Sequence, residues 1–147
     1  MELKIKRLNY KARIPTYATP GSGCFDLYSI NEAPQLVKEA APRTFDTGLA
    51  FEVPKGHVML IFSRSGHGFN SDVRLANCVG VIDSDYRGEV KVRLTNDPSS
   101  NWGGFTVQPN DRIAQAMVIP VERVEFILCD ELVPTERAAG GFGSTGA

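Results

Sequence analysis

Residues 89–95 read Glu-Val-Lys-Val-Arg-Leu-Thr, and apolar side chains at positions 90, 92 and 94 alternate with polar ones. Because successive side chains of a β-strand point to opposite faces of a sheet, this alternation predicts a strand with one buried face. Residues 58–62 and 114–119 are continuous apolar runs rich in β-branched side chains, which is typical of strands buried on both faces. Residues 121–127 alternate less regularly, but their composition also favours a strand. These stretches predict a β-sheet protein.

Glycine and proline interrupt the chain at short intervals, with 14 glycines and 9 prolines in 147 residues. This spacing favours many short strands over long helices. Residues 53–56, Val-Pro-Lys-Gly, place Pro and Gly where a type I turn prefers them, and 96–99 and 109–111 contain two more reversals. Residues 65–76 are the best candidate for a single short helix. We therefore predict an all-β, jelly-roll-like sandwich or barrel with at most one short helix.

The composition predicts one globular domain. A length of 147 residues corresponds to a single domain, and 16 basic against 17 acidic residues give a net charge of −1. This balance disfavours binding to nucleic acid or to an anionic membrane surface. The apolar runs are too short to span a bilayer, the first residues lack a signal-peptide pattern, and the 3 scattered cysteines argue against a disulfide framework. We expect a cytoplasmic protein, or one of the host cytoplasm if the gene is viral.

Residues 137–147 differ from the rest of the chain because they are rich in glycine and contain one large apolar side chain, Phe142. In isolation such a segment cannot bury enough surface to offset the entropy of ordering it. Two interpretations stay open on composition alone: a frayed terminus, or a flexible lid that orders over a ligand. Glycine amides approach phosphate oxygens without hindrance from a Cβ, which suits a lid over a phosphorylated ligand.

Two polar segments follow apolar runs. Asp83 comes directly after residues 79–82, Val-Gly-Val-Ile, so its carboxylate ends a predicted strand and suits a general base toward water. A plain polar reversal between two strands is the alternative interpretation. Arg64 and Ser65 offer a guanidinium group and a hydroxyl that suit an anion. The 2 histidines lack metal-ligand spacing, so zinc is not predicted. These residues predict a β domain whose polar loops suit a phosphorylated ligand.

Five motifs occur in order along the chain: Gly23-Cys-Phe-Asp-Leu-Tyr28, Arg64-Ser-Gly66, Asn77-Cys-Val-Gly-Val-Ile-Asp-Ser-Asp-Tyr-Arg-Gly88, Asp111-Arg-Ile-Ala-Gln115 and Arg137-Ala-Ala-Gly-Gly-Phe-Gly-Ser-Thr-Gly146. The third is long and specific. In this order they resemble the trimeric dUTP pyrophosphatase (dUTPase) family, from about residue 20 to the C-terminus. The resemblance implies a jelly-roll homotrimer that uses Mg²⁺ to hydrolyse dUTP to dUMP and pyrophosphate. That reaction supplies dUMP for thymidylate synthesis and keeps uracil out of DNA.

The resemblance also implies roles for residues of the third motif. Asp83 would be the base that orients and deprotonates the attacking water. Tyr86 would stack beneath the deoxyribose and exclude a 2′-hydroxyl. Uracil would be read by the amide of Asn77 and by main-chain groups of the hairpin spanning residues 81–91, among them those of Val81, Ile82 and Lys91.

The other motifs are implied to hold the triphosphate and its metal. The residues implied to hold phosphates are Arg64, Ser65, Gly66 and Gln115. Asp26 is implied to meet Mg²⁺ through water. In the last motif the implied contacts are Arg137 on the γ-phosphate, Phe142 on uracil and Gly143 on the phosphates. Each site would take the first, second and fourth motifs from one chain, the third from a neighbour and the fifth from the remaining subunit. We therefore expect residues 1–136 to form the β domain and residues 137–147 to form its lid.

The sequence departs from the family pattern near the second motif, where Ser63 precedes Arg64 and His67-Gly68-Phe69 replaces a small apolar pair. Two rival functions stay open. A dCTP deaminase resembles this fold, but it needs a catalytic Glu and a different hairpin, so the segment 83–86 argues against it. A binding or regulatory module that uses the nucleotide only as a switch is the second rival.

Overall fold

The strand predicted at residues 89–95 lies at the centre of a three-stranded antiparallel sheet in the computed structural model, which describes residues 1–97, 104–141 and 144. This strand, β10 (Lys91–Asn96), pairs with β5 (Arg43–Asp46) on one side and β8 (Val73–Leu75) on the other. The side chains of Val90, Val92 and Leu94 are each 1% exposed, so the predicted buried face is confirmed.

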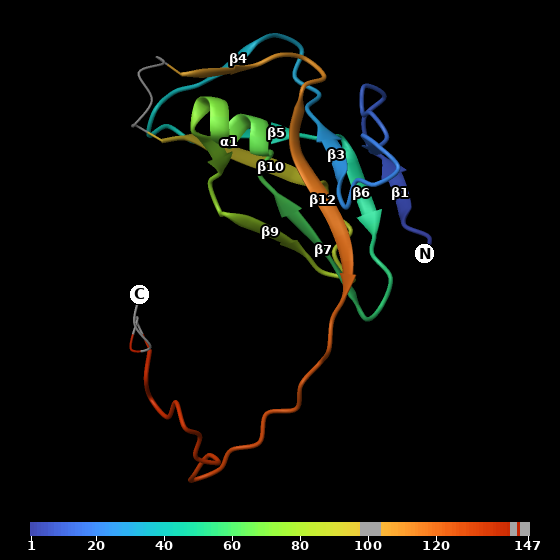
Figure 1. The fold of residues 1–147 in the computed structure, drawn as a ribbon. Helices are drawn as coiled ribbons and strands as arrows, with labels where there is room; N and C mark the ends of the chain where they lie inside the picture. The colour runs from blue at the N-terminus through green and yellow to red at the C-terminus, as the bar shows by residue number, and fades with distance from the viewer. Residues whose placement is uncertain (98–103, 142–143, 145–147) are drawn as a thin grey trace.

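The continuous apolar runs form the middle of a five-stranded sheet (Figure 1). Its order is β2 (Thr16–Tyr17), β3 (Phe25–Tyr28), β12 (Arg112–Pro120), β7 (His57–Phe62) and β9 (Val79–Ile82), with antiparallel pairing throughout. In β7, Val58, Met59 and Ile61 are buried, whereas Leu60 and Phe62 are only partly buried. The two strand predictions are therefore confirmed, but burial on both faces is incomplete.

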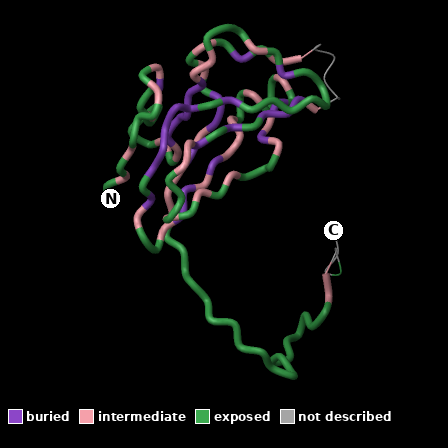
Figure 2. The backbone as a smooth tube through the Cα atoms, turned by 180° about the vertical axis from the view of Figure 1, so that it is seen from behind, coloured by how far each residue is buried: buried purple, intermediate pink, exposed green. Residues whose placement is uncertain are grey.

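Two further pairs complete the β structure: β1 (Lys4–Arg7) with β6 (Leu49–Glu52), and β4 (Gln35–Val37) with β11 (Phe105–Val107). The described residues contain one helix, α1 (Ser65–Ser71). Side chains from β3, β6, β7, β10 and β12 share one hydrophobic core, and Figure 2 shows these buried positions gathered in the body of the molecule. The all-β prediction with one short helix is confirmed within this part of the chain. No helix in it has the length and apolar character needed to cross a bilayer.

The helix predicted over residues 65–76 is too long. It ends at Ser71, because Asp72 adopts a left-handed backbone conformation with φ 51°. Val73 and Leu75 then alternate with Arg74 and are buried as part of β8, at 0% and 2% exposure. Packing against β10 therefore decides the conformation of residues 73–75.

The turn predicted at residues 53–56 forms one residue later. The amide of His57 donates to the carbonyl of Pro54 at 3.1 Å, and Gly56 has φ 73°. Gly56 is therefore the third turn position, where a type II turn requires positive φ, so the type I prediction is wrong. The reversal at residues 109–111 is confirmed by a hydrogen bond from the Asp111 amide to the Gln108 carbonyl at 3.2 Å. Of the reversal predicted at 96–99, positions 98 and 99 lie outside the described residues.

Residues 121–141, called the arm below, leave the body after β12 and extend away from it (Figure 1). The strand predicted at residues 121–127 is wrong for the single chain, because these residues pair with no strand of the part that the structure describes. Their apolar side chains are open to solvent: Phe126 is 92% and Leu128 is 99% exposed. A β-strand needs the edge of another strand for its backbone hydrogen bonds. The described residues of this chain offer no strand edge that pairs with the arm.

Candidate functional site

The structure brings three of the five motifs together at one end of the five-stranded sheet. Across that sheet Asp26 of β3 lies opposite Gln115 of β12, and Gln115 lies opposite Phe62 of β7. Arg64 and Ser65 follow β7 directly, so they reach the same end. A cavity of about 320 Å³, called the cationic cavity below, lies at this end. It is lined by Asp26, Arg64, Ser65, Arg112, Gln115 and residues of the segment 18–24.

Asp26 is nearly buried and lies between two guanidinium groups. Arg64 Nε is 3.5 Å from Asp26 Oδ1, and Arg112 Nη1 is 3.3 Å from Asp26 Oδ2. The amide group of Gln115 donates to the Ser63 carbonyl at 2.9 Å, and the Ser63 hydroxyl accepts from the Leu75 amide at 2.9 Å. Ser63, the residue before Arg64, is thus held through both its carbonyl and its hydroxyl. Two forked guanidinium groups beside an open cavity are well suited to phosphate oxygens.

Arg112 was not among the residues predicted to bind a ligand, although it belongs to the fourth motif. Strict alternation would place Arg112 and Gln115, three positions apart, on opposite faces of β12. The pairing with β3 shifts between Arg112 and Ala114, which inserts Ile113 as an extra residue. This β-bulge turns Arg112 and Gln115 toward the same cavity. A bulge of this kind is not visible in the apolar pattern of the sequence.

His67, one of the departures from the family pattern, packs behind Arg64. Its Nε2 lies 3.2 Å from Arg64 Nη1, and its ring centroid is 4.8 Å from that of Phe105. Burial, and then the positive charges of Arg64 and Arg112, lower the pKa of His67 to about 4, while Asp111 opposes this shift. The ring is therefore neutral at physiological pH, and Nε2 can accept a hydrogen bond from the Arg64 guanidinium.

His67 should make the folded state sensitive to acid. Between the ordinary pKa of 6.5 and the folded-state pKa of about 4, the unfolded chain binds a proton on this ring that the folded chain does not. Stability contributed by the neutral ring is thus present above that window and is lost as the pH falls through it. The urea midpoint should fall less between pH 7 and about pH 5 in His67→Leu than in the unsubstituted chain. Equal decreases would mean that the ring does not carry this dependence.

Asp83 lies at the other end of the sheet. In the antiparallel pair of β7 and β9, Val79 is opposite Phe62 and Ile82 is opposite Met59. Asp83 therefore follows the end near His57, whereas Arg64 follows the opposite end, about 20 Å further along the strands at about 3.3 Å per residue. Asp83 is exposed and lines a separate cavity of about 790 Å³. One chain therefore does not bring the predicted base to the cationic cavity.

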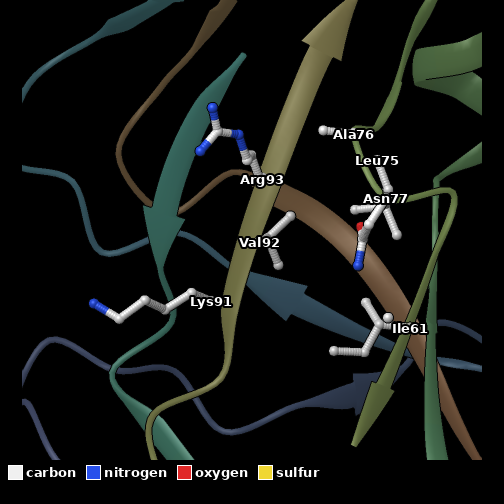
Figure 3. Close-up of a pocket in the computed structure, with 8 residues that line it drawn as sticks. Ile61, Leu75, Ala76, Asn77, Lys91, Val92 and Arg93 are labelled. Carbon is white, nitrogen blue, oxygen red and sulfur yellow. The ribbon is translucent and has the colours of Figure 1, made fainter.

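A third cavity, of about 390 Å³, lies between β9 and β10 and is lined by Asn77, Gly80 and Lys91 (Figure 3). In Figure 3 Val92 lies on the side of β10 that faces Asn77, whereas the Lys91 side chain extends from the other side. A Cβ added at Gly80 would lie 3.1 Å from the Cβ of Ile61, another lining residue, so a side chain at this position would crowd Ile61. Val81 lines the Asp83 cavity instead.

Tyr86 folds back over the hairpin loop. A Cβ added at Gly88 would fall 2.4 Å from the Tyr86 hydroxyl oxygen, so the ring lies directly across Gly88. The hydroxyl donates to the carbonyl of Glu89 at 3.0 Å. At 43% exposure, the ring is held in place but leaves part of its surface open to a ligand.

Of the residues predicted in the last motif, Arg137 is the one that the structure describes, and it lines none of these cavities. Arg137 lies in the arm, exposed, and its Nε donates to the Gly140 carbonyl at 2.9 Å. Phe142 and Gly143 lie outside the described residues. The described site residues thus form three groups: the cationic cavity, the hairpin with Asp83, and the arm.

An all-β fold that carries a cavity lined by two arginines defines a protein suited to a phosphorylated ligand. The family model for dUTPase matches residues 10–146, and the chain belongs to the dUTPase family. A deoxyuridine 5′-triphosphate nucleotidohydrolase of Nautilia profundicola is 46% identical over 146 residues, which cover 99% of each chain. One of Bordetella avium is 40% identical over 147 residues, covering 99% of this chain and 97% of the relative.

Comparison with solved structures gives the same fold. The dUTPase of Staphylococcus bacteriophage 80alpha, solved with dUPNHPP, has a TM-score of 0.90 and 23% identity, and 99% of each chain is covered. The predicted jelly-roll-like β fold is therefore confirmed.

Proposed function

We propose that this chain hydrolyses dUTP to dUMP and pyrophosphate, which supplies dUMP for thymidylate synthesis and keeps uracil out of DNA. Family membership supports this reaction, as do the names of relatives that are 40–46% identical over nearly the whole chain. The observation that carries the proposal is the cationic cavity, where Asp26, Arg64, Arg112 and Gln115 converge from three motifs. The cytoplasm is the proposed location, since all three cysteines are free thiols.

The cationic cavity is proposed to hold the triphosphate. The guanidinium groups of Arg64 and Arg112 bind its oxygens, and Ser65, Gly66 and Gln115 add a hydroxyl, a backbone amide and a side-chain amide. As negative charge builds on the phosphoryl oxygens and the departing pyrophosphate, these donors stabilise it. His67 keeps an acceptor behind Arg64, which helps to hold the guanidinium group in place.

The carboxylate of Asp26 is proposed to hold Mg²⁺ that arrives with the substrate. Among the described residues no cluster of three or more His, Cys, Asp or Glu side chains is suited to a metal ion. Mg²⁺ commonly binds to one or two carboxylates, keeps several waters and takes its other ligands from substrate phosphates. Asp26, the carboxylate that lines the cationic cavity, would hold the ion through water in this way. When bound, Mg²⁺ neutralises charge on the phosphates.

The hydrolytic site is proposed to form between copies of the chain in a homotrimer. Asp83 is the base: its carboxylate takes a proton from the water that attacks the α-phosphorus in line with the departing pyrophosphate. Within one chain Asp83 lies at the opposite end of the sheet from Arg64, so a neighbouring copy must bring it to the triphosphate. Asn77, with main-chain groups of Val81, Ile82 and Lys91, reads uracil, and the ring of Tyr86 excludes a 2′-hydroxyl from the sugar.

The arm supports assembly with other copies. Its exposed apolar side chains, among them Phe126 and Leu128, need a partner surface. The strand β1 offers an edge, because among the described residues it pairs with β6 alone. Charges match as well: β1 carries Lys4, Lys6 and Arg7, whereas residues 121–136 carry five acidic side chains and one basic. We propose that the arm of one copy lies on another copy and that Arg137, Phe142 and Gly143 close over the bound nucleotide there.

Pyrophosphate release tests the proposed reaction. With Mg²⁺ present, the purified chain should release pyrophosphate from dUTP and leave UTP and dCTP largely unreacted. Release of ammonia from dCTP would instead favour the deaminase. Binding of dUpNHpp with no turnover of dUTP would favour a binding module.

A further inference from the structure

Glu89 joins the base of the hairpin to the turn between β5 and β6. Its Oε1 accepts a hydrogen bond from the Gly48 amide at 2.7 Å, and its Oε2 lies 3.5 Å from Lys91 Nζ. Lys91 Nζ in turn contacts Asp46 Oδ1 at 2.8 Å. The contacts of Glu89 with Gly48 and of Lys91 with Asp46 each connect residues that are more than forty positions apart in the sequence.

The turn that Glu89 reaches is closely packed. Gly48 has φ 67°, and an added Cβ would lie 2.8 Å from the Cβ of Ala12 and 3.0 Å from that of Asn9. Closely packed neighbours therefore fix the Gly48 amide in space. A carboxylate bonded to that amide is held at a fixed point of the body.

The peptide group between Glu89 and Val90 is held in the same way. The Val90 amide of this group donates to the Leu49 carbonyl at 2.9 Å, and in the next peptide group the Val90 carbonyl accepts from the Thr47 hydroxyl at 2.6 Å. The carbonyl of Glu89, in that peptide group, is the acceptor for the Tyr86 hydroxyl. The Tyr86 ring is thus tied to the body through one residue, Glu89, whose backbone and side chain both make hydrogen bonds.

We propose that Glu89 is a positioning residue for sugar discrimination, because it fixes the carbonyl that holds the Tyr86 ring across Gly88. This inference rests on the proposed role of Tyr86 against the 2′-hydroxyl. Glu89 itself does not touch the substrate. It acts by keeping the Tyr86 ring from moving aside when a ribonucleotide enters.

The ratio of kcat/KM for UTP to kcat/KM for dUTP measures this role. Glu89→Ala removes the acceptor for Gly48, and the ratio should rise roughly three- to tenfold. Glu89→Gln is the matched control, since its amide oxygen still accepts from the Gly48 amide, and its ratio should stay close to that of the unsubstituted chain. A role limited to stability would lower the melting temperature without moving the ratio.

Tyr86→Phe provides a second variant that does not depend on the folding of Glu89→Ala. It removes the hydroxyl that reaches the Glu89 carbonyl, so the ratio should move in the same direction. The double variant Tyr86→Phe/Glu89→Ala should raise the ratio little more than the single variant with the larger effect does. Both substitutions act on the same link between the Tyr86 ring and the body. Fully additive effects would overturn the proposal.

Amide hydrogen exchange gives a readout without turnover. Exchange at residues 47–49 should be faster in Glu89→Ala than in Glu89→Gln, because the Gly48 amide has lost its acceptor. Tyr86→Ala separates the two possible failures. If Tyr86→Ala raises the ratio and Glu89→Ala does not, Glu89 has no positioning role. If neither raises it, the proposed role of Tyr86 fails, and the inference fails with it.

Discussion

Asp83→Asn is expected to lower the turnover of dUTP by about 10²–10⁴-fold while binding of dUpNHpp stays nearly unchanged. Asparagine keeps the shape of the side chain but cannot take a proton from the attacking water. The carboxylate is exposed at the end of β9, away from the core, so the fold should tolerate the change. Steady-state pyrophosphate release and titration with dUpNHpp measure the two quantities.

Asp85→Asn is the matched control for this experiment. Asp85 is two residues further on, is also exposed, and lines the same cavity of about 790 Å³. The substitution removes the same charge from a position with no proposed role in the reaction. If Asp83→Asn keeps more than about a tenth of the turnover, or if both variants lose it equally, Asp83 is not the base.

Truncation after Ala139 should lower dUTP hydrolysis by about 10²-fold and leave folding and the number of subunits in the oligomer unchanged. The truncated chain keeps Arg137 and lacks Phe142 and Gly143, so the loss reports on the part of the lid proposed to cover uracil and the phosphates. The truncated chain keeps every described residue of the hydrophobic core, so thermal unfolding should barely change.

A melting temperature lower by many degrees would contradict the lid interpretation. In that case residues 140–147 would be structural, and loss of activity would follow from loss of the fold. Turnover equal to that of the full chain would exclude the last motif from the site altogether.

Local patterns predicted the strands that pack within the chain. The alternation at residues 90, 92 and 94 identified the buried face of β10 because its partners β5 and β8 belong to the same chain. The composition of residues 121–127 also favours a β-strand, but no strand edge among the described residues of this chain pairs with them. Propensity reports that a segment suits a strand, and pairing depends on whether an edge is present.

The candidate site was predictable in its residue types and unpredictable in its grouping. The motifs gave Asp26, Arg64 and Gln115, but the β-bulge that adds Arg112 depends on the register between β12 and β3. The separation of Asp83 from Arg64 likewise follows from the pairing of β7 with β9. The contact of Glu89 with Gly48 joins two loops, and no local pattern in the sequence indicates it.

The proposal that neighbouring subunits complete each site is tested most directly with mixed trimers. Chains carrying Asp83→Asn and chains truncated after Ala139 should each be nearly inactive alone. Unfolded together in equal amounts and refolded, they should regain activity, because some sites take Asp83 from a truncated chain and Phe142 from an Asp83→Asn chain.

With independent choice of the two donors, roughly a quarter of the sites in the refolded mixture should be intact. Preformed trimers mixed without exchange should regain none. Samples whose mass analysis confirms mixed trimers should therefore show turnover near one quarter of that of the unsubstituted chain if neighbouring subunits complete each site. Mixed trimers as inactive as their parents would contradict it, since Asp83 and the lid would then serve one site from the same chain.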